Sequence, residues 1–278
     1  MDIYFYGDVM SQASPAKPAV LSVCDVELRY GGTVIQKDLC FEIHQGNIFV
    51  IMGGSGCGKS TLLKHMIGLL RPHSGAINYD GTDLWEADKA HRNQMLRNIG
   101  VLYQQGALWS SLTLAENMMV PMEAYTALNR KERRELAALK LSMVGLAGFE
   151  DHMPAEISGG MRKRAGLARA MALDPDILFL DEPSAGLDPI TAKLLDDLIL
   201  ELRAALGSTI VVVSHELASI FAIADNAVFL DTKLKTMLAT GHPVALRDHS
   251  PNPQIRQFLA RGEPTTLLSP SRPCMEVS

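Results

Sequence analysis

The residues best suited to chemistry in this sequence lie in one glycine-rich stretch. The stretch comprises Gly53, Gly54, Ser55, Gly56, Cys57, Gly58, Lys59, Ser60 and Thr61. Its glycines allow backbone conformations closed to residues with a Cβ, so consecutive N–H groups can surround a phosphate at the positive start of a helix. Lys59 can then reach the β and γ phosphates, and the Ser60 hydroxyl can bind Mg²⁺. This spacing is that of the P-loop.

Two predicted elements would hold this loop. Residues 47–52 are apolar enough for a buried strand, and residues 62–67 contain no breaker and are typical of a helix. Strand, glycine-rich turn and helix therefore follow in the order that the P-loop requires. A glycine-rich turn with a chance lysine is the weaker interpretation. Cys57 is either a small tolerated residue or a redox switch, and the first is favoured.

Two adjacent carboxylates follow a second predicted buried strand, residues 176–180. Asp181 is suited to a water-mediated contact with Mg²⁺. Glu182, one residue further on, is suited to act as a general base that polarises an attacking water. The alternative is a pair of acidic residues that only cap a strand, but the P-loop requires an acidic partner of this kind.

Two more polar residues stand at the ends of predicted strands. Gln104 follows residues 98–103, and its amide could contact both Mg²⁺ and the attacking water. His215 follows the β-branched strand 209–213, at the edge of a parallel sheet where ligands bind, so it could sense the γ-phosphate and hold Glu182. Taken alone, the glutamine would be an ordinary loop residue and the histidine a structural one.

A second helix start with anion-binding character lies near residue 160. Its residues are Ser158, Gly159, Gly160 and Met161. The serine is placed as an N-cap and the glycines expose backbone N–H groups, although a simple cap would look the same. Two such helix starts in one chain suggest that they serve one nucleotide from two subunits. After the carboxylates, a turn leads into another helix through Ala185, Gly186, Leu187 and Asp188.

The remaining chain predicts an α/β core with additions. Alternating apolar residues in 20–30 and 39–43 indicate an antiparallel flap, and Tyr30 at its edge could stack on an adenine ring or simply pack in the strand. Segments 116–126, 130–145 and 161–173 are typical of helices and predict an inserted helical lobe. Near the C-terminus, Ile255, Phe258 and Leu259 have the spacing of a short amphipathic helix.

Composition limits the possible functions. The chain has 278 residues, 47% of them hydrophobic, and a net charge of −5, which disfavours nucleic-acid binding through bulk positive charge. We expect no membrane span and no secretory signal, and a loose N-terminal leader. Cys24, Cys40, Cys57 and Cys274 lack the spacing of a zinc site or a disulfide framework, which predicts a reduced, cytosolic setting.

In their order and spacing, these elements resemble the ATP-binding-cassette (ABC) ATPases. The resemblance covers about residues 20–245 and implies a P-loop NTPase with a RecA-like core, an antiparallel β flap and an inserted helical subdomain at about 105–172. It also implies a leader at 1–19 and a tail at 246–278. Two copies would sandwich two ATP molecules, each held by one P-loop and by the partner's Ser158–Met161 signature. Gln104, Asp181, Glu182 and His215 would take the family's Q-loop, Walker B, catalytic-base and switch roles.

A narrower resemblance rests on Met161, where most cassettes have Gln, on residues 162–165 and 188–191, and on the tail 253–259. These segments are similar to the ATPases of MCE-associated phospholipid transporters, the MlaF-like branch of diderm bacteria. That resemblance implies a peripheral protein at the cytoplasmic face of the inner membrane. Its partners would be a membrane permease, a periplasmic MCE-domain protein and a small STAS-domain protein. The tail would either cross to the other ATPase copy or pack on its own core.

Other functions fit the same cassette. It could serve another importer or exporter, or a mechanical signalling complex that controls cell-wall hydrolases. Cassettes of translation usually come in pairs and those of DNA repair carry long coiled coils, and this sequence has neither. The permease is expected to dock near residues 104–113, where Trp109 and the methionines at 118, 119 and 122 either line a groove or pack in the core.

Overall fold

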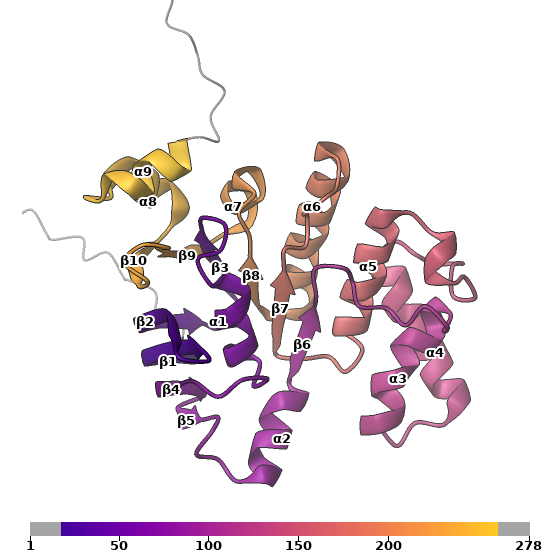
Figure 1. The fold of residues 1–278 in the computed structure, drawn as a ribbon. Coiled ribbons are helices and arrows are strands. Elements are labelled where there is room, and N and C mark those ends of the chain that lie inside the picture. Colours follow the sequence, from indigo (N-terminus) through magenta and orange to yellow (C-terminus); the bar gives the residue numbers. More distant parts are fainter. Residues whose placement is uncertain (1–17, 261–278) are drawn as a thin grey trace, which may run out of the picture.

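The computed structural model describes residues 18–260, so residues 1–17 of the predicted leader, Cys274 and the last part of the tail lie outside the described residues, and Ala19 already belongs to the first strand. The central layer is a six-stranded sheet in the order β10-β9-β3-β8-β7-β6 (Figure 1). Its strands are β3 (Ile48–Gly53), β6 (Ile99–Leu102), β7 (Ile177–Asp181), β8 (Thr209–Val213), β9 (Asn226–Leu230) and β10 (Met237–Gly241). All neighbours in this sheet are parallel except β10, which runs antiparallel to β9.

The middle strands are buried on both faces, which explains why their sequences are continuous apolar runs. Every residue of β3 and β8 is buried. In a parallel sheet the carboxyl ends of the strands meet at one edge, so the residues that follow β3, β6, β7 and β8 come together there. Those residues are the P-loop, Gln104, the two carboxylates and His215.

The flap is a second, antiparallel sheet in the order β2-β1-β4-β5. Its strands are β1 (Ala19–Tyr30), β2 (Thr33–His44), β4 (Ser74–Tyr79) and β5 (Thr82–Asp83). The flap packs on one face of the central sheet, where Phe41 stacks on Phe49 with ring centroids 5.3 Å apart. Figure 1 shows α1 (Lys59–Met66) lying between the two sheets. The flap therefore encloses the helix that begins at the P-loop.

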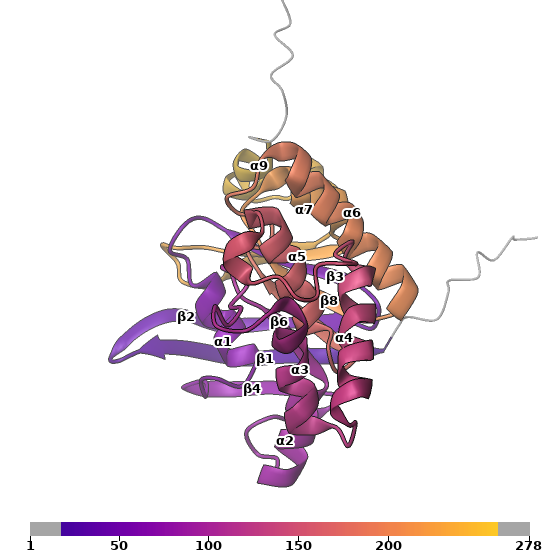
Figure 2. The same ribbon diagram turned by 90° about the vertical axis from the view of Figure 1, so that its right-hand side faces the viewer.

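Three helices form a lobe between β6 and β7 in the chain, at one side of the molecule (Figures 1 and 2). They are α3 (Leu114–Tyr125), α4 (Arg130–Met143) and α5 (Gly159–Ala170), with a 3-10 turn at Pro154–Glu156. Thr113 with Glu116, and Asn129 with Glu132, form reciprocal capping boxes that fix where α3 and α4 begin. Pro121 lies inside α3, which therefore continues through a residue that usually breaks helices.

Five further helices of the described chain lie outside the lobe. They are α2 (Lys89–Arg97), α6 (Pro189–Leu206), α7 (Leu217–Ile223), α8 (Pro243–His249) and α9 (Pro253–Ala260). The sequence interpretation missed α2, which has no buried residue and hence no apolar periodicity to detect. In α9, Ile255 and Leu259 have no exposed surface and Phe258 meets Phe229 edge-on. These three side chains therefore pack on their own chain.

Within residues 18–260 no helix combines the length and the apolar character that crossing a bilayer requires. Cys24, Cys40 and Cys57 are free thiols, and only Cys57 is buried.

Candidate functional site

The phosphate-binding loop connects β3 to α1 and depends on glycine at two places. Gly58 has φ +95°, and a Cβ there would lie 2.7 Å from Cγ2 of Ile35. A Cβ on Gly53 would lie 2.4 Å from the carbonyl oxygen of Leu230. Both distances are shorter than real contacts allow, so larger residues would displace the loop from β2 and β9.

The start of α1 offers unsatisfied donors. Among the residues that the structure describes, no side chain caps this helix, whereas α2 to α6 each begin with a side-chain cap. Its first-turn N–H groups therefore remain available for an anion. Lys59 is 8% exposed, and its ammonium donates to the carbonyls of Gly53 at 3.0 Å and Gly54 at 3.1 Å. This arrangement fits the phosphates of a nucleotide.

Ser60 and Asp181 meet across the gap between α1 and β7. The Ser60 hydroxyl donates to Oδ1 of Asp181 at 3.1 Å. Burial raises the pKa of Asp181, and the Ser60 hydrogen bond opposes that shift. Among the described residues no three His, Cys, Asp or Glu side chains gather into a metal cage. Two adjacent oxygens fit Mg²⁺, which usually binds one or two protein oxygens together with phosphate and water.

Glu182 is held by its backbone and by one carboxylate oxygen. Its φ of +49° is unusual for a residue with a Cβ, and its N–H donates to the carbonyl of Val213 at 2.9 Å. Oε1 lies 2.8 Å from Nδ1 of His215. Oε2 is buried and has no hydrogen-bond partner among the described residues. Because a buried oxygen without a partner is costly, this atom is suited to receive a water molecule.

The signature segment lies beside the Gln104 loop, which follows β6. One shallow pocket is lined by Gln104, Gln105, Gly159, Arg162, Lys163, Ala185, Gly186 and Leu187. The P-loop glycines are not among its lining residues. Within one chain this pocket therefore brings Gly159 of the signature together with the Gln104 loop and with residues 185–187. The Gln104 side chain is exposed.

The signature helix α5 and helix α6 begin side by side. The Ser158 hydroxyl caps α5 by accepting from the N–H of Met161 at 3.2 Å. Asp188 caps α6, and the Thr191 hydroxyl donates to its Oδ2 at 2.5 Å, which lowers the Asp188 pKa. A Cβ on Gly160 would lie 2.6 Å from Cγ2 of Thr191. Glycine at 160 therefore sets how closely the two helices approach.

Tyr30 stands at the end of β1, where its side chain is 80% exposed. Such an exposed ring is free to stack on a planar ligand.

Sequence reasoning missed several functional neighbours. Lys163 is a buried lysine whose ammonium donates to the carbonyls of Gln104 and Glu182. Asp196 is also buried, and its Oδ2 accepts from the Ser219 hydroxyl at 2.8 Å. The Ser219 oxygen also lies 3.3 Å from the hydroxyl oxygen of Ser184, two residues after Glu182, and can accept from that hydroxyl. No sequence pattern marks these contacts, because the burial of the charged residues becomes visible only in the folded structure.

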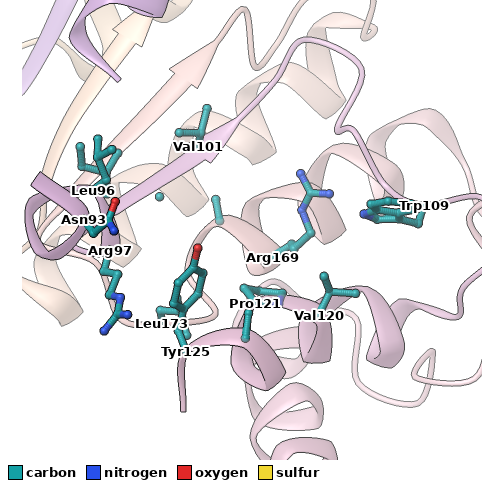
Figure 3. Close-up of a pocket in the computed structure, with 14 residues that line it drawn as sticks. Asn93, Leu96, Arg97, Val101, Trp109, Val120, Pro121, Tyr125, Arg169 and Leu173 are labelled. Carbon is teal, nitrogen blue, oxygen red and sulfur yellow. The ribbon is translucent and has the colours of Figure 1, made fainter. Parts of the chain in front are cut away.

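A groove separates the helical lobe from the central sheet (Figure 3). Arg97 from α2 and Arg169 from α5 both line it, and the Arg97 guanidinium lies over the Tyr125 ring, 5.0 Å from its centroid. Trp109 lines the groove and is 59% exposed, whereas Met118 and Met122 have no exposed surface. For those two methionines, packing in the core is therefore the correct interpretation.

The fold and this site define an ABC-type ATPase. The model of the ABC transporter family matches residues 36–185, which include the P-loop, the Gln104 loop, the signature and both carboxylates. The chain belongs to the ABC transporter family, as one of its ATPases.

Two groups of relatives share most of the chain. The intermembrane phospholipid transport system ATP-binding protein MlaF of Escherichia coli K12 is 39% identical over 235 residues, which cover 84% of this chain and 86% of MlaF. The probable ribonucleotide transport ATP-binding protein mkl of Mycobacterium leprae is 41% identical over 83% of this chain. The match spans only 65% of the length of mkl.

Solved structures agree with the fold. The ATP-binding cassette MJ0796, a dimer in a post-hydrolysis state bound to ADP and Pi, is 29% identical. Its TM-score is 0.72 over 80% of this chain and 98% of that one. CbiO1 of Clostridium perfringens, part of the ABC transporter complex cbiONQ, is 26% identical with a TM-score of 0.74, over 87% of this chain and 96% of that one.

Proposed function

We propose that two copies of this chain hydrolyse ATP at two shared sites and so drive a membrane transporter. The P-loop of one copy would hold each nucleotide, and residues Ser158 to Met161 of the other copy would close over it. The observation that carries this proposal is that, within one chain, the pocket at Gly159 of the signature is lined by the Gln104 loop and residues 185–187 and not by the P-loop. The MJ0796 dimer with ADP and Pi supports it. Residues 20–245 would form the ATPase domain.

Three side chains would act on the phosphates and the attacking water. Lys59 would exchange its two loop carbonyls for phosphate oxygens. Glu182 would accept a proton from water at Oε2 while His215 holds Oε1, and Gln104 would approach the same water. Ser60 and Asp181 would hold Mg²⁺, which offsets phosphate charge when bound. Catalysis of this kind depends mainly on positioning and electrostatics.

We propose a phospholipid as the transported substrate, moved between the two membranes of a diderm bacterium. The similarity to MlaF over 86% of its length supports this choice, as does Met161 in the signature. Ribonucleotide transport, for which the mkl relatives are named, is the second candidate, because those relatives are about as similar in sequence to this chain. A mechanical signalling complex is a further alternative. A transported molecule would bind to other subunits, so this chain would look the same with or without transport.

The groove in Figure 3 would receive a membrane permease. The groove lies between the helical lobe and the central sheet. A permease segment bound in it would therefore be displaced when the lobe moves as the two copies close. The chain would thus be a peripheral subunit at the cytoplasmic face of the inner membrane. An MCE-domain protein and a STAS-domain protein would complete the assembly.

The test is transport by the reconstituted complex. The full chain is co-purified with its membrane permease and placed in proteoliposomes, with the Lys59→Ala variant as control. We expect ATP-dependent transfer of a fluorescent phospholipid that the variant loses. ATP turnover with ribonucleotide uptake and no lipid transfer would refute the substrate, and absence of Lys59-dependent turnover would refute the ATPase mechanism.

A further inference from the structure

Helix α5 holds the Gln104 loop along its length. Lys163 donates to the carbonyl of Gln104, and Arg169, six residues later on the helix, donates to the carbonyl of the residue after Gly106. Between them, Gly166 lies against Gly106, where a Cβ on Gly166 would lie 2.9 Å from Cα and 3.0 Å from the oxygen. Contacts at three helix positions spaced three residues apart, one of them between two backbones, leave little room for the helix to slide along the loop. The helix and the loop should therefore move as one body.

Lys163 also connects α5 and the Gln104 loop to Glu182, the residue that follows strand β7. Its ammonium donates to the backbone carbonyl of Glu182 at 3.1 Å, and the side chain is only 8% exposed. An ammonium has three donors, and here two serve carbonyls from different segments. The carbonyl that Lys163 holds belongs to the same residue as the proposed catalytic carboxylate, and the φ of that residue is +49°.

Lys163 lies near the N-terminal end of α5, the end that would face the partner copy. The helix starts at Gly159, one turn before Lys163, and Ser158 caps it. On the proposed function, that helix start contacts the nucleotide held by the other copy. A shift of α5 when that nucleotide binds would pull both carbonyls that Lys163 holds.

We propose that Lys163 is a positioning residue that transmits ATP binding at one site to Glu182 of the other site. The inference rests on the proposed function, because it needs two copies that share their nucleotides. Burial disfavours the charged ammonium, while the carboxylates of Asp181 and Glu182 favour it. The structure thus keeps a costly buried charge where it bridges the two parts that must move together.

The test compares Lys163→Met and Lys163→Gln with a matched control. Lys140→Met removes another buried lysine of the same lobe, which is 3% exposed and paired with Asp174, away from the site. For each protein, in complex with its permease, we measure thermal midpoint, ATP affinity, kcat and the Hill coefficient for ATP. Lys163→Met should bind ATP within about twofold of wild type, because the P-loop is unchanged.

Its kcat should fall at least about tenfold, since displacing a catalytic group by about 1 Å can cost about a hundredfold. Its Hill coefficient should approach one. Lys163→Gln keeps a hydrogen-bond donor, so its kcat and Hill coefficient should lie between those of Lys163→Met and those of the wild type. Lys140→Met should lower the thermal midpoint without the change in Hill coefficient.

Equal kcat and Hill coefficient in Lys163→Met and wild type would overturn the inference, as would equal kinetic losses in the two methionine variants. Both outcomes presuppose Lys59-dependent turnover in the wild type. Loss of that turnover would instead refute the proposed function itself.

Discussion

Replacing Glu182 by Gln tests the proposed chemistry most directly. The amide keeps the shape of the side chain, and its Oε1 can still accept from Nδ1 of His215, 2.8 Å away in the wild type. What is lost is the basicity of Oε2, the buried oxygen without a partner. General-base catalysis contributes about 10²- to 10⁴-fold to rate, so we expect a loss of that size. At 1.36 kcal/mol per factor of ten, the barrier rises by about 3 to 5 kcal/mol.

Phosphate release under saturating ATP measures this loss, and nucleotide affinity is measured in parallel. Binding should remain near the wild-type value, because the variant leaves the P-loop unchanged. ATP should then trap a closed dimer that gel filtration detects. Glu216 supplies a matched control, since its Oε1 lies 3.6 Å from Nε2 of the same imidazole and its side chain is half exposed. Glu216→Gln should keep turnover within about twofold, and undiminished turnover in Glu182→Gln would remove that residue from the proposed role.

Two further predictions concern packing and charge around the site. Gly160→Ala should reduce turnover, because the added Cβ would lie 2.6 Å from Cγ2 of Thr191. Adding Thr191→Ser removes that methyl group and keeps the hydroxyl that donates to Asp188, so the double variant should regain part of the rate. Steady-state ATP hydrolysis measures both effects. Asp196→Asn tests a buried carboxyl whose pKa burial raises, so its contribution to stability is present at low pH and lost as pH rises through the folded-state pKa. The thermal midpoint of the variant minus that of the wild type should therefore increase from about pH 4 to about pH 7, and a constant difference would contradict the assignment.

Much of this architecture could be predicted because the sheet and the P-loop obey strong local rules. Continuous apolar runs predict β3, β7 and β8, and the residues that follow these strands lie at one edge of the sheet as expected. Helix α2 was missed because it buries no side chain, although Asp88 at its N-cap was an available signal. The start of α3 was placed at Glu116, two residues late, despite the Thr113 and Glu116 capping box.

Contacts of long or buried polar side chains were beyond sequence reasoning. Lys163 follows the signature in a run of basic residues, and nothing in that pattern distinguishes a buried ammonium from an exposed one. The hydrogen bonds of Asp196 and Ser219 join α6 to α7, a pairing that only the packed structure determines. The left-handed backbone of Glu182 likewise follows from the surrounding strands, since glutamate has no local preference for it.

The exposed ring of Tyr30 has a consequence for nucleobase selectivity. In the proposed site this ring would meet the base by its face, and stacking of that kind does not distinguish one base from another by hydrogen bonds. The triphosphate, gripped by the loop and by Lys59, would then supply most of the recognition. An enzyme built in this way should accept GTP nearly as well as ATP. Which nucleotide it uses in the cell would then follow the relative concentrations of the two.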